Sequence, residues 1–327
     1  MDEQRHEHVQ DDIVRNEPEP ILAEWQASLR QGIGLLEIII SPRKLQVKVL
    51  GTNGTGYARI IDPFRDHLVV NTHRILSHQL HSVHTEHVHT QNNLPYRQLL
   101  KFVFESLPSN IQVNQLNYHV VWDECRKNPA DLAAFENFKQ GCINKISEAL
   151  DTRINNLANQ PVKVGKFIIE YDGSDEGQDE IQVLLDNIDM IGPREIEIRS
   201  PRDQIEQSQL YMDHNVVHTA GWNTARNIVI SDKFWMEPEP ECWRNISQLY
   251  ITIDQLTAAN LERILENLFM SETFVSCTIN LVIPIQQSWR SILPVGAVII
   301  PEYEFEYGRT LRGRFVADSD KIMIRRV

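Results

Sequence analysis

The stretch Leu249–Ile283, LYITIDQLTAANLERILENLFMSETFVSCTINLVI, decides the fold of this chain. Its two ends, Leu249–Ile253 and Cys277–Ile283, are apolar and rich in β-branched residues, a composition typical of buried strands. Between them runs a stripe of apolar residues at helical spacing, formed by Leu261, Ile264, Leu265, Leu268 and Phe269. A strand, a helix and a strand in this order predict a βαβ unit with parallel strands and a right-handed crossover.

The helix of this unit has a start signal and a large apolar face. Asp254 or Thr257 can cap it, because either side chain can accept a hydrogen bond from an N–H group of the first turn. Burial of the apolar stripe gives roughly 10 kcal/mol at about 1.5–3 kcal/mol per side chain, as an upper estimate. We therefore expect packing, rather than helix propensity, to stabilise this helix.

Short apolar strands of the same kind recur throughout the second half of the chain. Their central isoleucines are 28, 32, 23 and 28 residues apart, at Ile168, Ile196, Ile228, Ile251 and Ile279. Irregular spacing of this size predicts a leucine-rich-repeat-like stack of strands and helices. An ordinary mixed α/β sheet without true repeats is the alternative.

The regions on either side of this stack have the pattern of antiparallel sheet. Short β-rich runs separated by turn signals predict a small antiparallel meander first, followed by a polar loop at Ser77–Asn93. We expect one α/β domain over residues 35–327, after a disordered or short helical segment over residues 1–34. The domain is expected to comprise a β-meander and loop over 35–95, helices and a strand over 96–160, the repeat-like region over 161–300 and closing antiparallel strands over 301–327.

Composition restricts the class of protein. The chain has 327 residues, 42% of them hydrophobic and 24% charged, as in folded proteins, and no apolar run predicts a membrane span. Its net charge of −13, without a cluster of Lys and Arg, argues against a nucleic-acid partner. Because the four cysteines are far apart and the N-terminus is acidic, we expect reduced thiols in a cytoplasmic or nuclear protein.

Several segments match, in the same order, the motifs of one known family. They are KVGKFIIE at Lys163–Glu170, DEIQVLLDNIDMIGPREIEI at Asp179–Ile198, GWNTARNIVI at Gly221–Ile230, and the strand, helix and strand of Tyr250–Ile279. Together they resemble the FTH domain, which follows the F-box in a large family of nematode F-box proteins. The resemblance covers about Leu35–Ile283.

The resemblance implies a protein–protein interaction module, the substrate-recognition arm of a Skp–cullin–F-box ubiquitin ligase. In such a ligase the F-box docks on a Skp-type adaptor. An F-box is a helical module that opens with Leu-Pro, whereas residues 1–34 are too short for it and lack this pattern. We therefore expect a protein partner, which the sequence does not name, but no tight association between this chain and a Skp adaptor.

Two further features suggest chemistry but have simpler explanations. Histidines are dense between His67 and His89, yet those three residues apart do not share one helix face, and HTEHVH is not the HExxH motif of zinc enzymes. We expect a polar surface loop there, with no metal. The glycines of GTNGTG lack the Lys-Ser/Thr pair of a phosphate-binding loop and predict a hairpin turn at Asn53-Gly54.

The sequence contains no catalytic signature and no cofactor motif that we recognise. We therefore assign no catalytic, cofactor-binding or metal-ligating residue and do not expect an enzyme. A hydrolase or transferase whose site is built from non-contiguous residues is the alternative.

Alternation along the predicted strands marks two candidate partner-binding residues. In REIEIR, Ile196 and Ile198 are expected to face the core, which leaves Glu197 on the outer, concave face. In LYITI the same rule places Ile251 inward and Tyr250 outward. Tyrosine is a common interface anchor, so Glu197 and Tyr250 are the candidate contacts. The alternative is that both side chains lie on a solvated sheet face and bind no partner.

Overall fold

The computed structural model describes residues 27, 32–42, 44–64, 67–76, 79–88, 99–100, 103, 107, 111–121, 129–156, 161–170, 175–199, 210–211, 214–235, 245–253, 256–283, 285, 289–295, 297–300, 304–308, 310–315 and 320–327. The predicted N-terminal segment and the helix expected near residue 96 lie mostly outside these residues. Of that helix, Leu99, Leu100 and Val103 are described, and all three are helical and buried.

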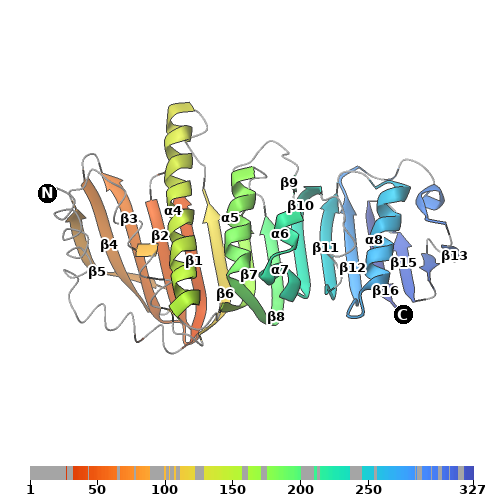
Figure 1. Cartoon of the computed structure of the whole chain (residues 1–327), viewed down its shortest axis with the longest axis horizontal. Helices are drawn as coiled ribbons and strands as arrows, with labels where there is room; N and C mark the ends of the chain where they lie inside the picture. Colours follow the sequence, from red (N-terminus) through yellow and green to blue (C-terminus); the bar gives the residue numbers. More distant parts are fainter. Residues whose placement is uncertain are drawn as a thin grey trace. The chain divides into compact units, whose positions relative to one another are not determined.

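The chain forms two compact units, Met1–Val164 and Gly165–Val327. The first contains an antiparallel meander in which each strand pairs with the one before it (Figure 1). Its strands are β1 (Ile33–Ser41), β2 (Lys44–Gly51), β3 (Gly56–Phe64), β4 (His67–Leu76) and β5 (Gln79–Val88). A sixth strand, β6 (Gln112–Val120), pairs in parallel with β1, and the long helix α4 (Pro129–Asn156) contacts β1.

The loop predicted at Ser77–Asn93 is wrong over most of its length. Residues Gln79–Val88 form β5, which is antiparallel to β4. The segment is polar, but strand pairing satisfies backbone N–H and C=O groups whatever the side chains are, and an edge strand can carry polar side chains on an exposed surface. The flanking residues 77–78 and 89–93 lie outside the described part of the chain.

The GTNGTG segment forms the hairpin between β2 and β3, as predicted. Gly54 has a φ of 78°, and the N–H of Thr55 donates to the side-chain oxygen of Asn53 at 3.0 Å. At Gly56, a Cβ would lie only 1.9 Å from the carbonyl oxygen of Val49. The glycines therefore serve the turn and the close approach of two strands.

The second unit is a mixed sheet with helices on one face. Its parallel strands pair in the order β8 (Ile188–Arg199), β10 (Asn227–Trp235), β11 (Gln248–Ile253) and β12 (Ser276–Leu281), with β7 (Val162–Glu170) beside β8 and the short β9 (Leu210–Tyr211) beside the end of β10. An antiparallel group then continues from β12 through β16 (Lys321–Arg326), β15 (Leu311–Phe315), β14 (Glu304–Tyr307) and β13 (Val298–Ile300). This arrangement confirms the predicted α/β class.

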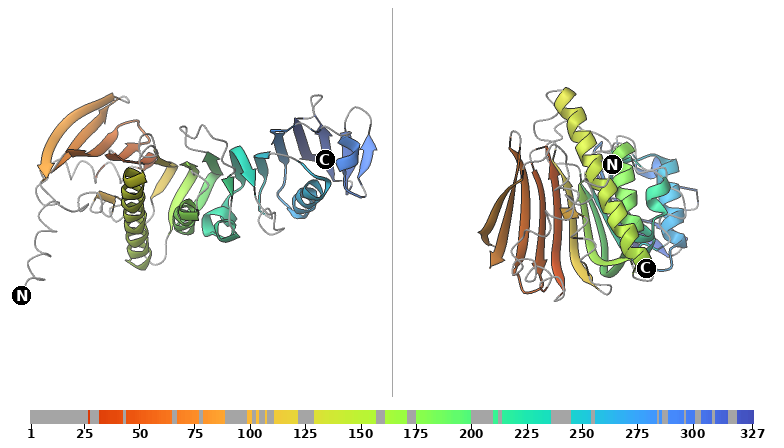
Figure 2. Two further views of the ribbon diagram at one scale, coloured as in Figure 1. Left: turned by 90° about the horizontal axis from the view of Figure 1, so that it is seen from above. Right: turned by 60° about the vertical axis from the view of Figure 1, so that its left-hand side comes forward.

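The helices of the second unit lie on the same face of its sheet, as Figure 2 shows. They are α5 (Asp175–Asp186), α6 (His214–Val217), α7 (Ala220–Thr224) and α8 (Ala258–Met270), with a short 3-10 helix, η3 (Trp289–Ile292), after β12. Trp222 of α7 is 1% exposed, and the Thr219 hydroxyl accepts a hydrogen bond from its backbone N–H. In the described part of the chain, the criteria for a membrane-spanning helix are not met by any helix.

The predicted βαβ unit is present as β11, α8 and β12, with β11 parallel to β12. Thr257 is the cap, since its hydroxyl accepts from the N–H of Asn260 at 3.2 Å. Four members of the predicted stripe are buried, but Phe269 is 39% exposed. Phe269 lies at the border of the stripe, where its ring meets Tyr307 edge-on with centroids 6.2 Å apart.

Candidate protein-interaction face

The parallel strands of the second unit have the predicted register. Ile196 and Ile198 of β8 are 0% and 1% exposed. On β11, Leu249 and Ile251 are likewise buried, whereas Tyr250 is 38% exposed. Because side chains alternate along a strand, Tyr250 belongs to the sheet face opposite the helices. We call this face, formed by the outward side chains of β8, β10, β11, β12, β16, β15 and β14, the open strand face.

Tyr250 lies in the middle of a row that crosses this face. In the strand register it is opposite Val229 of β10 on one side and Thr278 of β12 on the other. Thr278 is in turn opposite Met323 of β16. Both neighbours have shorter side chains than tyrosine, the phenol ring is accessible, and the paired strands on both sides hold its backbone in place.

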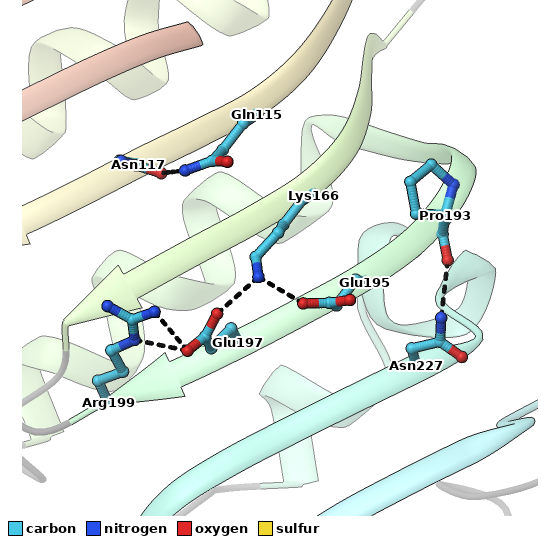
Figure 3. A network of polar contacts seen from close by, with 8 residues as sticks. All are labelled: Gln115, Asn117, Lys166, Pro193, Glu195, Glu197, Arg199 and Asn227. Carbon is cyan, nitrogen blue, oxygen red and sulfur yellow. Dashed lines mark hydrogen bonds and ion pairs between the residues drawn. The ribbon is translucent and has the colours of Figure 1, made fainter.

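The other candidate, Glu197, is held in an ion-pair network that also contains Lys166, Glu195 and Arg199 (Figure 3). The Lys166 ammonium nitrogen lies 2.6 Å from an oxygen of Glu195 and 2.8 Å from an oxygen of Glu197. Arg199 donates to the second side of the Glu197 carboxylate, with Nε and a terminal nitrogen at 2.6 Å and 2.5 Å from the same oxygen. Glu197 is therefore only 9% exposed, and its carboxylate is already occupied.

The network favours the charged forms of Glu197 and Lys166. Burial opposes ionisation of Glu197, but the hydrogen bonds and charges of Lys166 and Arg199 outweigh it and hold the pKa of Glu197 below its ordinary value. Burial likewise opposes the charge of Lys166, while the carboxylates of Glu195 and Glu197 raise its pKa overall. This part of the open strand face is thus self-neutralised.

A second group of charged residues, which the sequence patterns had not marked as a site, lies on the same face. On β16 the outward residues are Lys321, Met323 and Arg325, since Ile322 and Ile324 are buried. The alternation of KIMIRR could have indicated this, but only strand pairing shows which residues lie beside them. In the register, Arg314 of β15 is opposite Met323.

The histidine-rich segment contributes to β4 and β5 rather than to a loop. His81 is opposite Arg74, His84 opposite Thr72, and His87 opposite Val69. His78 and His89 lie outside the described residues. Within the described ranges, no group of three or more His, Cys, Asp or Glu side chains is arranged to hold a metal ion.

Two of the four cysteines are described, and both are buried thiols. Cys142 lies in α4 and Cys277 in β12, each 1% exposed. Burial raises the pKa of the Cys277 thiol far above its usual range, which disfavours the reactive thiolate. Cys125 and Cys242 are outside the described residues.

Comparisons with known proteins add no family assignment. No protein-family model matches the chain, and neither a curated protein nor a solved structure gives a significant match.

Proposed function

We propose that this chain is a protein-interaction module whose open strand face in the second unit binds a protein partner. The observation that carries the proposal is the 38% exposure of Tyr250 in the centre of a paired sheet. Interface anchors are enriched in tyrosine, because the ring offers a large contact area and the hydroxyl adds a hydrogen bond. A ring on a central strand loses little conformational freedom when a partner binds.

The ion-pair network gives Glu197 a different part in this proposal. Its carboxylate is 9% exposed and engaged by two cations, so it positions Lys166 and Arg199 rather than contacting the partner as an anchor. Lys166 and Arg199 present more surface than the carboxylate they share. We propose Tyr250 as the anchor and Glu197 as a positioning residue.

More specifically, we propose that the chain is a substrate-recognition arm similar to the FTH domain, built as a leucine-rich-repeat-like stack. Parallel pairing of β8, β10, β11 and β12, with helices on one face, supports a stack of strand–helix units. In this proposal the partner is a protein selected for ubiquitination, and the connection to the ligase does not run through residues 1–34 of this chain.

Site-specific photo-crosslinking tests the location of the interface. Benzoylphenylalanine replaces Tyr250 in one sample and Met270, which is 67% exposed at the end of α8, in the matched control. We expect one protein to crosslink at position 250 but not at 270, and we expect unlabelled wild-type chain to compete while Tyr250→Ala competes poorly. Crosslinking of the same proteins at both positions would contradict the proposal.

A further inference from the structure

Basic side chains surround one exposed methionine on the open strand face. Met323 of β16 is 43% exposed. Lys321 and Arg325 are the outward residues before and after it on the same strand, and Arg314 is its opposite residue on β15. We call these four residues the Met323 cluster. An apolar centre thus has a cation on three sides, and on the fourth side it has Thr278.

Among the described residues, the cations of the cluster lack an ion-pair partner, although Glu304 of β14 is opposite Arg314 in the strand register. No carboxylate of the described residues forms an ion pair with Arg314, Lys321 or Arg325. Glu306, which could compensate, is bound instead to Arg312 at 2.6 Å. The only acids that the described strands β14, β15 and β16 contain are Glu304 and Glu306.

This local excess of positive charge is notable because the whole chain carries a net charge of −13. A basic site on an acidic protein concentrates the attraction for a negative partner at one place. By contrast, Arg326 points to the helix side, where it donates to the carbonyl oxygens of Leu268 and Phe269 at the end of α8. The two arginines of β16 therefore have different positions. Arg326 stabilises the end of α8, and Arg325 is exposed on the open strand face.

The cluster and Tyr250 are close enough for one ligand. Two strand spacings separate Tyr250 from Met323, a distance of about 10 Å. An extended peptide places every second side chain on one side, about 7 Å apart. A short extended segment can therefore contact the Tyr250 ring and the Met323 cluster together.

We infer that the open strand face binds an acidic peptide segment of its partner, with an apolar side chain on Met323 and flanking Asp or Glu residues on Arg314, Lys321 and Arg325. This inference rests on the proposed function and adds the chemistry of the partner. Carboxylates suit the site because arginine can hold both of their oxygens in a planar pair of hydrogen bonds. A nucleic acid is disfavoured because its continuous phosphate charge also meets the acidic surface of the chain.

Peptide selection on the full-length chain tests the inference. A phage-displayed library of random twelve-residue peptides is selected on wild type, and enriched peptides are labelled and titrated by fluorescence anisotropy. The variants are Arg325→Glu, Arg314→Glu and Tyr250→Ala, and the matched control is Arg263→Glu, which reverses an exposed charge on α8. Circular dichroism melts confirm that each variant is folded.

We expect enriched peptides to carry Asp or Glu around an apolar residue. Arg325→Glu and Arg314→Glu should each weaken binding about tenfold, because reversal replaces an attraction by a repulsion, while Arg263→Glu should leave it unchanged. Added salt should weaken binding to the wild type.

The remaining outcomes would contradict either the acidic-peptide inference alone or the proposed function as well. Selection of neutral or basic peptides, equal loss in Arg263→Glu, or tighter binding of an oligouridine RNA than of any peptide would overturn the inference. If Tyr250→Ala weakens binding and the charge reversals do not, the proposed function stands and the acidic partner fails. If neither kind of variant affects the selected peptides, both fail.

Discussion

The ammonium nitrogen of Lys166 lies 2.8 Å from a carboxylate oxygen of Glu197, across the gap between β7 and β8. This ion pair explains why an acidic side chain on a sheet face is nearly buried and why its pKa is lowered. The ion pair also distinguishes the two predicted partner-binding residues. The Glu197 side chain is already bound within the chain, whereas the Tyr250 side chain is exposed.

Removing the lysine should raise the pKa of Glu197. In Lys166→Met, burial continues to oppose ionisation and only Arg199 remains to counter it. A carboxyl-carbon NMR titration measures the change. Lys145→Met, which removes an exposed ion pair with Glu148 on α4, is the control and should leave the Glu197 titration unchanged.

The same pair predicts how stability depends on pH. Because the folded-state pKa of Glu197 lies below its ordinary value of 4.5, its contribution is present above that pH and is lost as the pH falls through the folded value. Lys166→Met should therefore show a smaller loss of unfolding free energy between about pH 5 and pH 2. An identical acid-induced loss in wild type and variant, measured by urea denaturation, would show that the pair does not stabilise the fold.

Truncation of Trp222 should destabilise the second unit. The side chain is 1% exposed, so Trp222→Ala leaves a large cavity and is expected to cost about 3–5 kcal/mol. Chemical denaturation measures the loss, and Trp222→Phe, which fills much of the cavity, should lose less. A melting temperature near that of wild type for Trp222→Ala would contradict the core placement.

The aromatic ring of Phe305 occupies the space that a side chain at Gly313 would need. The two residues are opposite each other on β14 and β15, and a Cβ at Gly313 would lie 2.0 Å from Cζ of Phe305. Gly313→Ala should cost about 1–3 kcal/mol through overpacking. A double-mutant cycle with Phe305→Leu checks the cause: the alanine should cost less in that background, and equal costs in both would rule out the ring as the obstacle.

The Cys277 thiol should be protected in the native protein. Burial raises the pKa of the thiol and excludes reagents. The test uses a variant in which Cys125, Cys142 and Cys242 are replaced by serine, so that only Cys277 can react. With a disulfide reagent, the folded variant should react at least about a hundredfold more slowly than the same variant unfolded in urea. Reaction of the folded chain at the rate of the unfolded one would place Cys277 on an accessible surface.

Much of the second unit could be predicted because local patterns there coincide with tertiary structure. The alternation in REIEIR and LYITI places their isoleucines in the core, and the apolar stripe of α8 with Thr257 before it defines a helix and its start. These signals are short-range: each depends on residues within a few positions of one another.

What could not be predicted depends on strand neighbours that are distant in the sequence. β5 is polar, and only its pairing with β4 shows it to be a strand. The burial of Glu197 requires Lys166 on a neighbouring strand. The Met323 cluster requires the register of β16 against β15, because Arg314 and Met323 are adjacent in space but not in the chain.

The role of Tyr250 as the anchor of the open strand face can be measured as the dissociation constant of Tyr250→Ala for the partner captured at position 250. Calorimetry with wild type, Tyr250→Ala and Met270→Ala provides the comparison. Both variants truncate an exposed side chain, Tyr250 on the open strand face and Met270 at the end of helix α8. We expect Tyr250→Ala to bind more weakly by at least about 1 kcal/mol, roughly fivefold in the dissociation constant, with an unchanged melting temperature. Met270→Ala should bind as wild type does. Equal affinity of wild type and Tyr250→Ala would contradict the assignment of the open strand face as the binding site.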